Sequence, residues 1–122
     1  LMKKIVAVTC LALASASTAM AQQPPKAATT TAQLVAMCQQ RNDVAQQNFC
    51  HGFGQGVFDT YLISRHPKNA PAFICAEGNG LTRQQHLDNF IKWTSANPQF
   101  NQMSAADTVL RYLGETYPCK KG

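Results

Sequence analysis

The sequence is poor in acidic residues and lacks the short motifs that usually mark catalytic, redox or metal sites. Aspartate and glutamate together number 6 in 122 residues, and no pair of them recurs at a spacing suited to general acid–base catalysis. No CxxC or HxxxH spacing occurs, so neither a redox dithiol nor a zinc site is indicated. The glycine-rich stretch 52–56 follows no strand and has no phosphate-binding lysine. These absences favour a protein that is not an enzyme and needs no cofactor.

Positive charge is also modest. Lysine and arginine number 11 and give a formal net charge of +5, which falls to +3 if Lys3 and Lys4 are removed with a leader. No basic stripe with interleaved aromatic residues appears, so we expect no nucleic-acid partner.

The longest apolar run lies near the N-terminus and has the pattern of a cleavable secretion signal. A short basic region precedes apolar residues 5–16, and Ala19-Met20-Ala21 is a small-x-small cleavage site. This run is too short to span a membrane, and no second apolar run follows. We therefore expect a signal peptide at residues 1–21 and a mature periplasmic chain that begins at Gln22.

The rest of the chain reads as one helical domain. Residues 22–31 are rich in Gln, Pro, Ala and Thr and predict a flexible lead-in, whereas Pro- and Gly-containing residues 68–80 predict a loop. Thr82 and Gln85 form a capping box at a helix start, and no hairpin dipeptide sits between alternating runs. The sequence predicts an all-α fold over residues 32–122, a small disulfide-stapled bundle of about four helices, at residues 32–41, 44–65, 82–97 and 104–117.

Apolar side chains at three- and four-residue spacing define the expected core. Phe53, Phe90 and Leu110 are assigned to it, and the loop segment Phe73-Ile74-Cys75 is expected to dock on it. The stripe of the second helix runs through Cys50, Phe53, Val57, Phe58, Tyr61 and Leu62.

Glycines interrupt the second helix. Gly52 and Gly56 each cost about 1 kcal/mol relative to alanine inside a helix. Their presence suggests either close approach of another backbone or an irregular helix start.

Four cysteines remain once Cys10 is lost with the leader, namely Cys38, Cys50, Cys75 and Cys119. An even number in a small exported domain indicates a disulfide-stapled scaffold, and four cysteines allow three pairings. If the first two helices form an antiparallel hairpin, Cys38 lies close to Cys50, and Cys75 would then pair with Cys119. The rival arrangement, which joins Cys50 to Cys75 and Cys38 to Cys119, stays open.

The order of these motifs resembles a known family. Cys50-His51-Gly52-Phe53-Gly54-Gln55-Gly56-Val57 is followed by Phe73-Ile74-Cys75, by a helix that ends at Asn97-Pro98, and by Tyr117-Pro118-Cys119. Together they resemble the Rap/Tai family of type VI secretion immunity proteins, whose members share C-x-G-[FY]-x-x-G-V, [FI]-C-x-P, N-P and [FY]-P-C motifs. The resemblance covers about Leu34 to Cys119. Ala76-Glu77 departs from it, because the family usually carries a proline there.

The resemblance implies a small, exported, all-helical and often dimeric protein without catalytic residues. Such proteins bind a cognate peptidoglycan amidase effector in the periplasm and block its active-site groove. Because loops on rigid scaffolds carry recognition, we expect the contact surface in residues 66–80, with Lys68 and Asn69 as partner-binding residues.

Two other roles compete with this interpretation. Small periplasmic acid-stress chaperones of the HdeA type are also disulfide-stapled and helical, but six carboxylates provide little for an acid switch. A different periplasmic binding role on the same scaffold is equally compatible with the sequence, because a fold does not by itself fix a function.

Overall fold

The structure, a computed structural model, describes residues 27–64 and 72–120. Over these residues the chain is helical, which confirms the predicted all-α class, and no strand is present in them. The elements in chain order are α1 (Thr31–Cys38), α2 (Val44–Ser64), α3 (Arg83–Ala96), the 3-10 turn η1 (Pro98–Phe100) and α4 (Ala105–Thr116).

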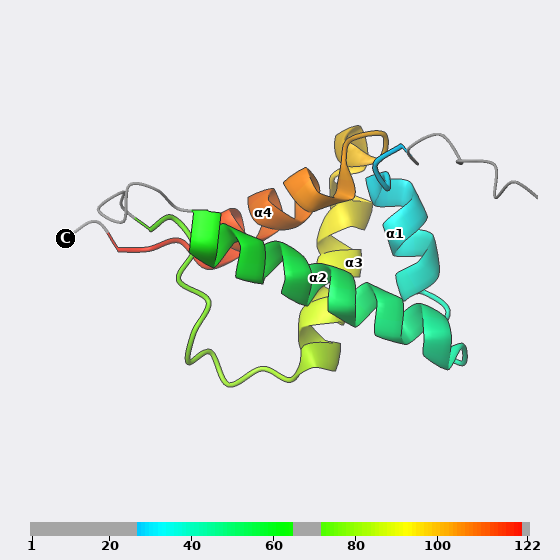
Figure 1. Cartoon of the computed structure of the whole chain (residues 1–122), viewed down its shortest axis with the longest axis horizontal. Helices are drawn as coiled ribbons and strands as arrows, with labels where there is room; N and C mark the ends of the chain where they lie inside the picture. The colour runs from blue at the N-terminus through cyan, green and yellow to red at the C-terminus, as the bar shows by residue number, and fades with distance from the viewer. Residues whose placement is uncertain (1–26, 65–71, 121–122) are drawn as a thin grey trace, which may run out of the picture.

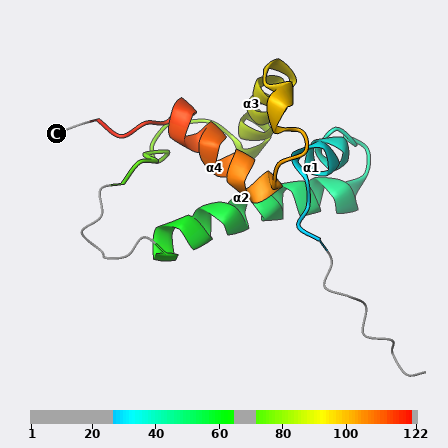
Figure 2. The same ribbon diagram turned by 90° about the horizontal axis from the view of Figure 1, so that it is seen from above.

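Helix α2 is the longest element and runs across the molecule, with the other helices gathered on one side of it (Figures 1 and 2). Helix α1 meets α2 at a steep angle near the start of α2, whereas α4 runs beside α2. The expected antiparallel hairpin of the first two helices is therefore not what forms. The one-sided arrangement also explains why only Cys50 and Tyr61 of α2 are buried.

The core lies where α1, α3 and α4 meet the N-terminal half of α2. The Phe90 and Tyr112 rings pack edge to face with centroids 5.4 Å apart, a favoured geometry for aromatic pairs. Phe90 is buried as predicted, but Phe53 and Leu110 are only half-buried. The buried cluster consists of Leu34, Cys38, Cys50, Leu87, Phe90, Ala105, Val109 and Tyr112.

The N-terminal edge of the domain is fixed by hydrogen bonds to the start of α4. The Ala105 N–H donates to the Thr29 carbonyl (2.8 Å), and the Thr31 N–H donates to the Met103 carbonyl (2.9 Å). Thr30 caps α1 through a capping box, and Thr31 is fully buried. The last three residues of the expected lead-in thus belong to the folded domain.

The predicted start of α3 is confirmed, since Thr82 accepts a hydrogen bond from the Gln85 N–H (3.1 Å) and the Gln85 side chain accepts one from the Thr82 N–H (2.8 Å). These capping contacts satisfy amide groups that have no partner within the helix.

Helix α1 ends at Cys38, three residues before the expected end at Arg41.

The glycines of α2 do not have the role suggested by the sequence. A Cβ atom added to Gly52 or Gly56 would meet nothing within 4 Å, and both residues lie inside the helix rather than at an irregular start. Within the described part of the chain, no other backbone approaches them. Their helical cost is therefore not offset by packing within this chain.

Candidate partner-binding surface

Both pairs of cysteines are joined. Cys38 bonds to Cys50 with Cα atoms 5.3 Å apart, and Cys75 bonds to Cys119 with Cα atoms 5.0 Å apart. This is the arrangement that the sequence favoured, and the rival pairing does not form. The first bond is buried, whereas Cys75 is exposed and Cys119 half-buried.

The second disulfide holds the chain that follows residues 65–71. The Cys75 N–H donates to the Tyr117 carbonyl (2.8 Å), and Ile74 forms an isolated bridge with Pro118. The Tyr61 hydroxyl of α2 accepts hydrogen bonds from the Phe73 and Ile74 amides, at 3.1 and 3.2 Å. Residues 73–75 are therefore attached both to α2 and to the C-terminal segment.

The predicted partner-binding residues Lys68 and Asn69 lie outside the described residues. Of the expected contact segment, residues 72–80 are described, and Gly78 and Gly80 adopt positive φ angles of 74° and 72°. Such angles favour glycine and permit the tight turns of this loop. The described part of the segment thus connects residues 73–75 to the start of α3. We call the attachment of residues 73–75 to α2 and to the C-terminal segment the clamp.

Exposed apolar side chains gather at the C-terminal end of α2. Leu62, Ile63 and Phe73 are 44%, 73% and 51% exposed. Phe73 still covers Tyr61, with ring centroids 4.7 Å apart. We call Leu62, Ile63 and Phe73 the apolar tip.

Sequence reasoning placed Leu62 in the core, and that assignment needs correction. The available signal was the succession Tyr61-Leu62-Ile63. Neighbouring residues on a helix point about 100° apart, so three in a row cannot share one buried face. The expected docking of the segment Phe73-Ile74-Cys75 is confirmed at Ile74, which is buried, whereas Phe73 packs on buried Tyr61 but stays half exposed.

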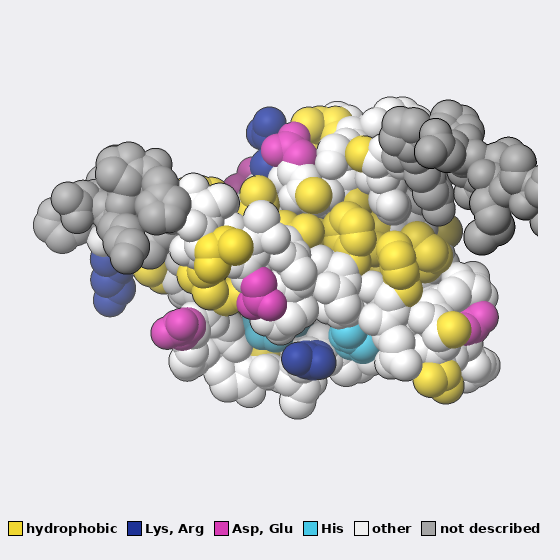
Figure 3. All heavy atoms as spheres, viewed as in Figure 1, with side chains coloured by type: hydrophobic (Ala, Val, Ile, Leu, Met, Phe, Trp, Pro, Cys, Tyr) yellow, Lys and Arg dark blue, Asp and Glu magenta, His cyan; other side chains and the backbone are white. Residues whose placement is uncertain are grey.

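An apolar groove of about 710 Å³ separates α2 from α4 and ends beside Phe73. Figure 3 shows hydrophobic side chains gathered in the band between these two helices. The absence of side chains at Gly52 and Gly56 widens it. This α2–α4 groove is lined by residues that include Gly52, Phe53, Gly56, Val57, Ala106 and Leu110.

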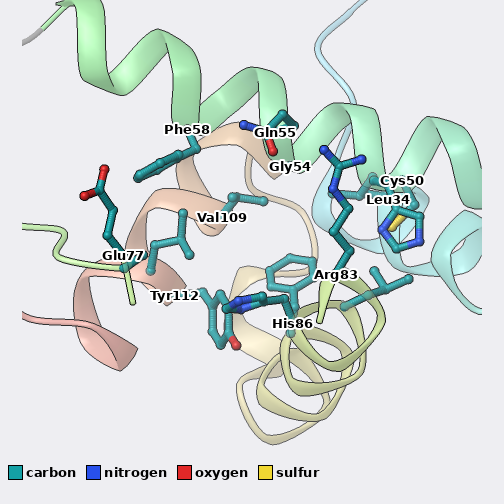
Figure 4. Close-up of a pocket in the computed structure, with 15 residues that line it drawn as sticks. Leu34, Cys50, Gly54, Gln55, Phe58, Glu77, Arg83, His86, Val109 and Tyr112 are labelled. Carbon is teal, nitrogen blue, oxygen red and sulfur yellow. The ribbon is translucent and has the colours of Figure 1, made fainter. Parts of the chain in front are cut away.

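A second hollow, of about 260 Å³, lies between α2 and α3 (Figure 4). Its floor is apolar, and Gly54 of α2 lines one wall. The polar side chains around this α2–α3 pocket are His51, Gln55, Glu77, Arg83 and His86.

Two of the ionisable side chains that line the pocket, His86 and Tyr112, lie near Tyr117. The His86 Nδ1 is 3.0 Å from the Tyr117 hydroxyl, a contact that positions the ring. Burial, with a smaller contribution from Tyr117, raises the pKa of Tyr112 to about 12, and its hydroxyl has no hydrogen-bond partner among the described residues. Over residues 27–64 and 72–120, no three His, Cys, Asp or Glu side chains are grouped as metal ligands.

The family profile of the Rap1a immunity proteins matches residues 30–119, which is most of the chain. The chain belongs to this family. The matched region contains the four helices and both disulfides. No curated protein and no solved structure matches the chain.

Membership of the Rap1a family indicates a role in immunity to a type VI secretion effector. The two disulfides agree with an extracytoplasmic protein. None of the helices in the described part of the chain has the length and apolar character that a bilayer crossing requires. The C-x-G-[FY]-x-x-G-V motif occupies the part of α2 between the α2–α4 groove and the α2–α3 pocket.

Proposed function

We propose that this Rap1a-family protein binds a cognate peptidoglycan amidase effector in the periplasm and blocks its active-site groove. The observation that carries the proposal is the family match. It is supported by the attachment of residues 73–75 to the helical scaffold through a disulfide and hydrogen bonds. The proposed inhibition is steric, so it requires no catalytic residue and no cofactor in this chain.

The clamp gives the proposed interface its physical basis. The Cys75–Cys119 bond and the hydrogen bonds from residues 73 and 74 to Tyr61 restrict the chain beside the segment before any partner arrives. Less conformational entropy is then lost on binding. The neighbouring apolar tip adds exposed apolar side chains, which mark many protein-binding surfaces.

Lys68 and Asn69 remain the proposed polar contacts, on the evidence of the sequence alone. Exchanging Lys68 for Glu and Asn69 for Trp should weaken binding to the amidase about tenfold or more, the usual effect of changing a central interface residue. Calorimetry with the captured amidase measures the change. Lys92→Glu, an exposed charge reversal on α3, is the matched control and should leave affinity unchanged. Unchanged affinity in the Lys68 and Asn69 variants would place the interface elsewhere.

We also propose that two copies associate through the α2–α4 groove. Its glycines leave room for a second helix to approach closely, and its lining is largely apolar. The helical cost of those glycines would then be offset in the dimer. Gly56→Leu should shift the molar mass in light scattering from dimer to monomer. A wild-type chain that is monomeric at high concentration contradicts this assignment.

Export is proposed to proceed through cleavage after Ala21. Amino-terminal sequencing of the periplasmic form tests this directly. A first residue of Gln22 supports the proposal, and an uncleaved membrane-bound chain contradicts it.

The acid-stress chaperone is the competing role, and the described carboxylates offer it little support. Hydrogen bonds from Gln46 hold the pKa of Asp43 below 3.8, and hydrogen bonds from Gln84 and Arg41 do the same for Asp88. A carboxylate with a lowered pKa stabilises the fold above about pH 3.8, and that stabilisation is lost as the pH falls below this value. Both carboxylates are solvent-accessible, so the loss should be small. Circular dichroism down to pH 2 tests this, since unfolding with client binding there would favour the chaperone.

A further inference from the structure

The α2–α3 pocket has features of a small-molecule site that the proposed immunity role does not use. It lies across α2 from the α2–α4 groove and shares no lining residue with it. Its apolar lining comes from different parts of the chain, including Phe58 of α2, Leu87 of α3 and Val109 of α4. Ligand pockets typically combine such an apolar lining with a few polar groups.

The hollow is large enough for an aromatic group. Its volume of about 260 Å³ exceeds the roughly 150 Å³ of an engineered apolar cavity that binds benzene. It stays open at α2 because Gly54 has no side chain, and a Cβ atom built there would meet nothing within 4 Å. A glycine inside a helix is unfavourable by about 1 kcal/mol, and here its effect is to keep the pocket open.

The pocket also has a cation, Arg83, at its edge. Arg83 begins α3, and Figure 4 shows its side chain extending from α3 toward α2 along the hollow. Among the described residues, Arg83 makes no ion pair. Glu77 lies at the opposite side of the hollow. An anionic group would therefore be attracted to the Arg83 side and repelled from the Glu77 side.

We propose that the α2–α3 pocket binds a small amphipathic acid, with its aromatic or branched apolar body against Leu87 and Val109 and its carboxylate at Arg83. A planar guanidinium recognises a carboxylate in a two-point geometry, which fixes the ligand's orientation. The pocket shares Ala76 and Glu77 with the segment expected to contact the effector, but the proposed ligand contacts at Arg83, Leu87 and Val109 lie outside that segment, so the two proposals are tested separately.

Naphthalene-2-acetate is a suitable probe, and its neutral amide is the matched compound. We expect amide shifts in NMR spectra that centre on residues around Gly54, Leu87 and Val109, with the acid bound about two- to fivefold tighter than the amide. That ratio is the range for one partly exposed charge contact. Equal affinity of the two compounds, or shifts confined to the α2–α4 groove, would overturn the proposal.

Variants of two glycines in α2 test whether the probe binds in the α2–α3 pocket. Gly54→Met places a side chain in the pocket and should abolish binding, whereas Gly52→Met, which faces the α2–α4 groove, should leave affinity unchanged. Gly54→Ala is a milder version that keeps the fold intact. If Gly54→Met binds the probe as the wild type does, the pocket is not the site.

A second pair of variants tests the carboxylate contact. Arg83→Gln should reduce affinity for the acid about two- to fivefold and leave affinity for the amide unchanged. Glu77→Gln should leave the affinity for the acid equal or raise it. Loss of acid binding in the Glu77 variant, or no loss in the Arg83 variant, would contradict the assigned orientation.

Discussion

The two ends of this molecule are built differently. Where α1 meets α4, Thr31, Ala105 and Thr108 are fully buried, and the Cys38–Cys50 bond lies within the core. At the C-terminal end of α2, apolar side chains remain exposed and the disulfide lies near the surface. Both ends carry a disulfide, but at one end the bond is buried in a packed core and at the other it lies near the surface with little packing around it. A chain of this size has one modest core, so a disulfide is the means of fixing a surface segment far from it.

The largest effect should come from removing the covalent link at the apolar tip. Replacing Cys75 and Cys119 with serine opens a 44-residue loop and should lower the free energy of unfolding by about 4 kcal/mol on the chain-entropy estimate. Urea denaturation measures the loss. A change below about 1 kcal/mol would mean that packing rather than the disulfide holds this end, and the contrast between the ends would fail.

At the packed end, burial of Tyr112 predicts a loss of stability in alkali. Its pKa is raised to about 12 by burial, so the contribution is present below pH 10 and is lost as the pH rises from 10 toward 12. The loss of unfolding free energy should be at most about 3 kcal/mol, at about 1.4 kcal/mol for each pH unit between 10 and 12. Tyr112→Phe should remove that dependence, because no other change accompanies loss of the hydroxyl. If the stability of the variant falls as steeply between pH 10 and 12, the loss does not come from Tyr112.

The buried hydroxyl pair at the same end is the next test. The Thr31 hydroxyl lies 2.7 Å from the Thr108 hydroxyl and 3.1 Å from the Met103 carbonyl oxygen. Thr31→Val leaves the Thr108 hydroxyl buried without this partner and should cost about 1–2 kcal/mol. Thr108→Val should cost less, because the Thr31 hydroxyl can still donate a hydrogen bond to the Met103 carbonyl oxygen. Thermal melts of both single variants and the double variant test the order, and additive losses would contradict a shared hydrogen bond.

The smallest predicted effect is an increase in stability. Gly52→Ala should stabilise the monomer by about 0.5–1 kcal/mol, since the new methyl group meets nothing and helix propensity improves. Gly114→Ala is the control, because its Cβ atom would lie 3.3 Å from the Phe73 ring and crowd it. Melts at low protein concentration compare the two. A gain at Gly114 equal to that at Gly52 would show that Phe73 moves freely.

Much of the fold was predictable because it depends on local signals. The capping box at Thr82 and Gln85 sets the start of α3, and Pro98 follows its end. The disulfide partners also followed from helix order, although the helices cross steeply instead of forming a hairpin. Proximity of a helix end to the next helix start was sufficient for the Cys38–Cys50 bond.

The surface was less predictable, since exposure depends on which elements cover a helix. Leu62 belongs to an apolar stripe in the sequence, yet its side chain is exposed in the fold. Gly52 and Gly56 suggested a close neighbour, but the described chain supplies none. Neither hollow beside α2 could be inferred, because each is shaped by residues far apart in the sequence. Periodicity identifies a candidate core face but does not reveal what remains uncovered.

The most direct test of the central claim is an inhibition assay. The mature chain with its disulfides intact would capture its partner from cells that produce it, and the partner would then be assayed for peptide release from peptidoglycan. The account predicts a peptidoglycan amidase whose activity is lost at one chain per enzyme. An amidase that stays active in excess chain, or a partner without this activity, would contradict it.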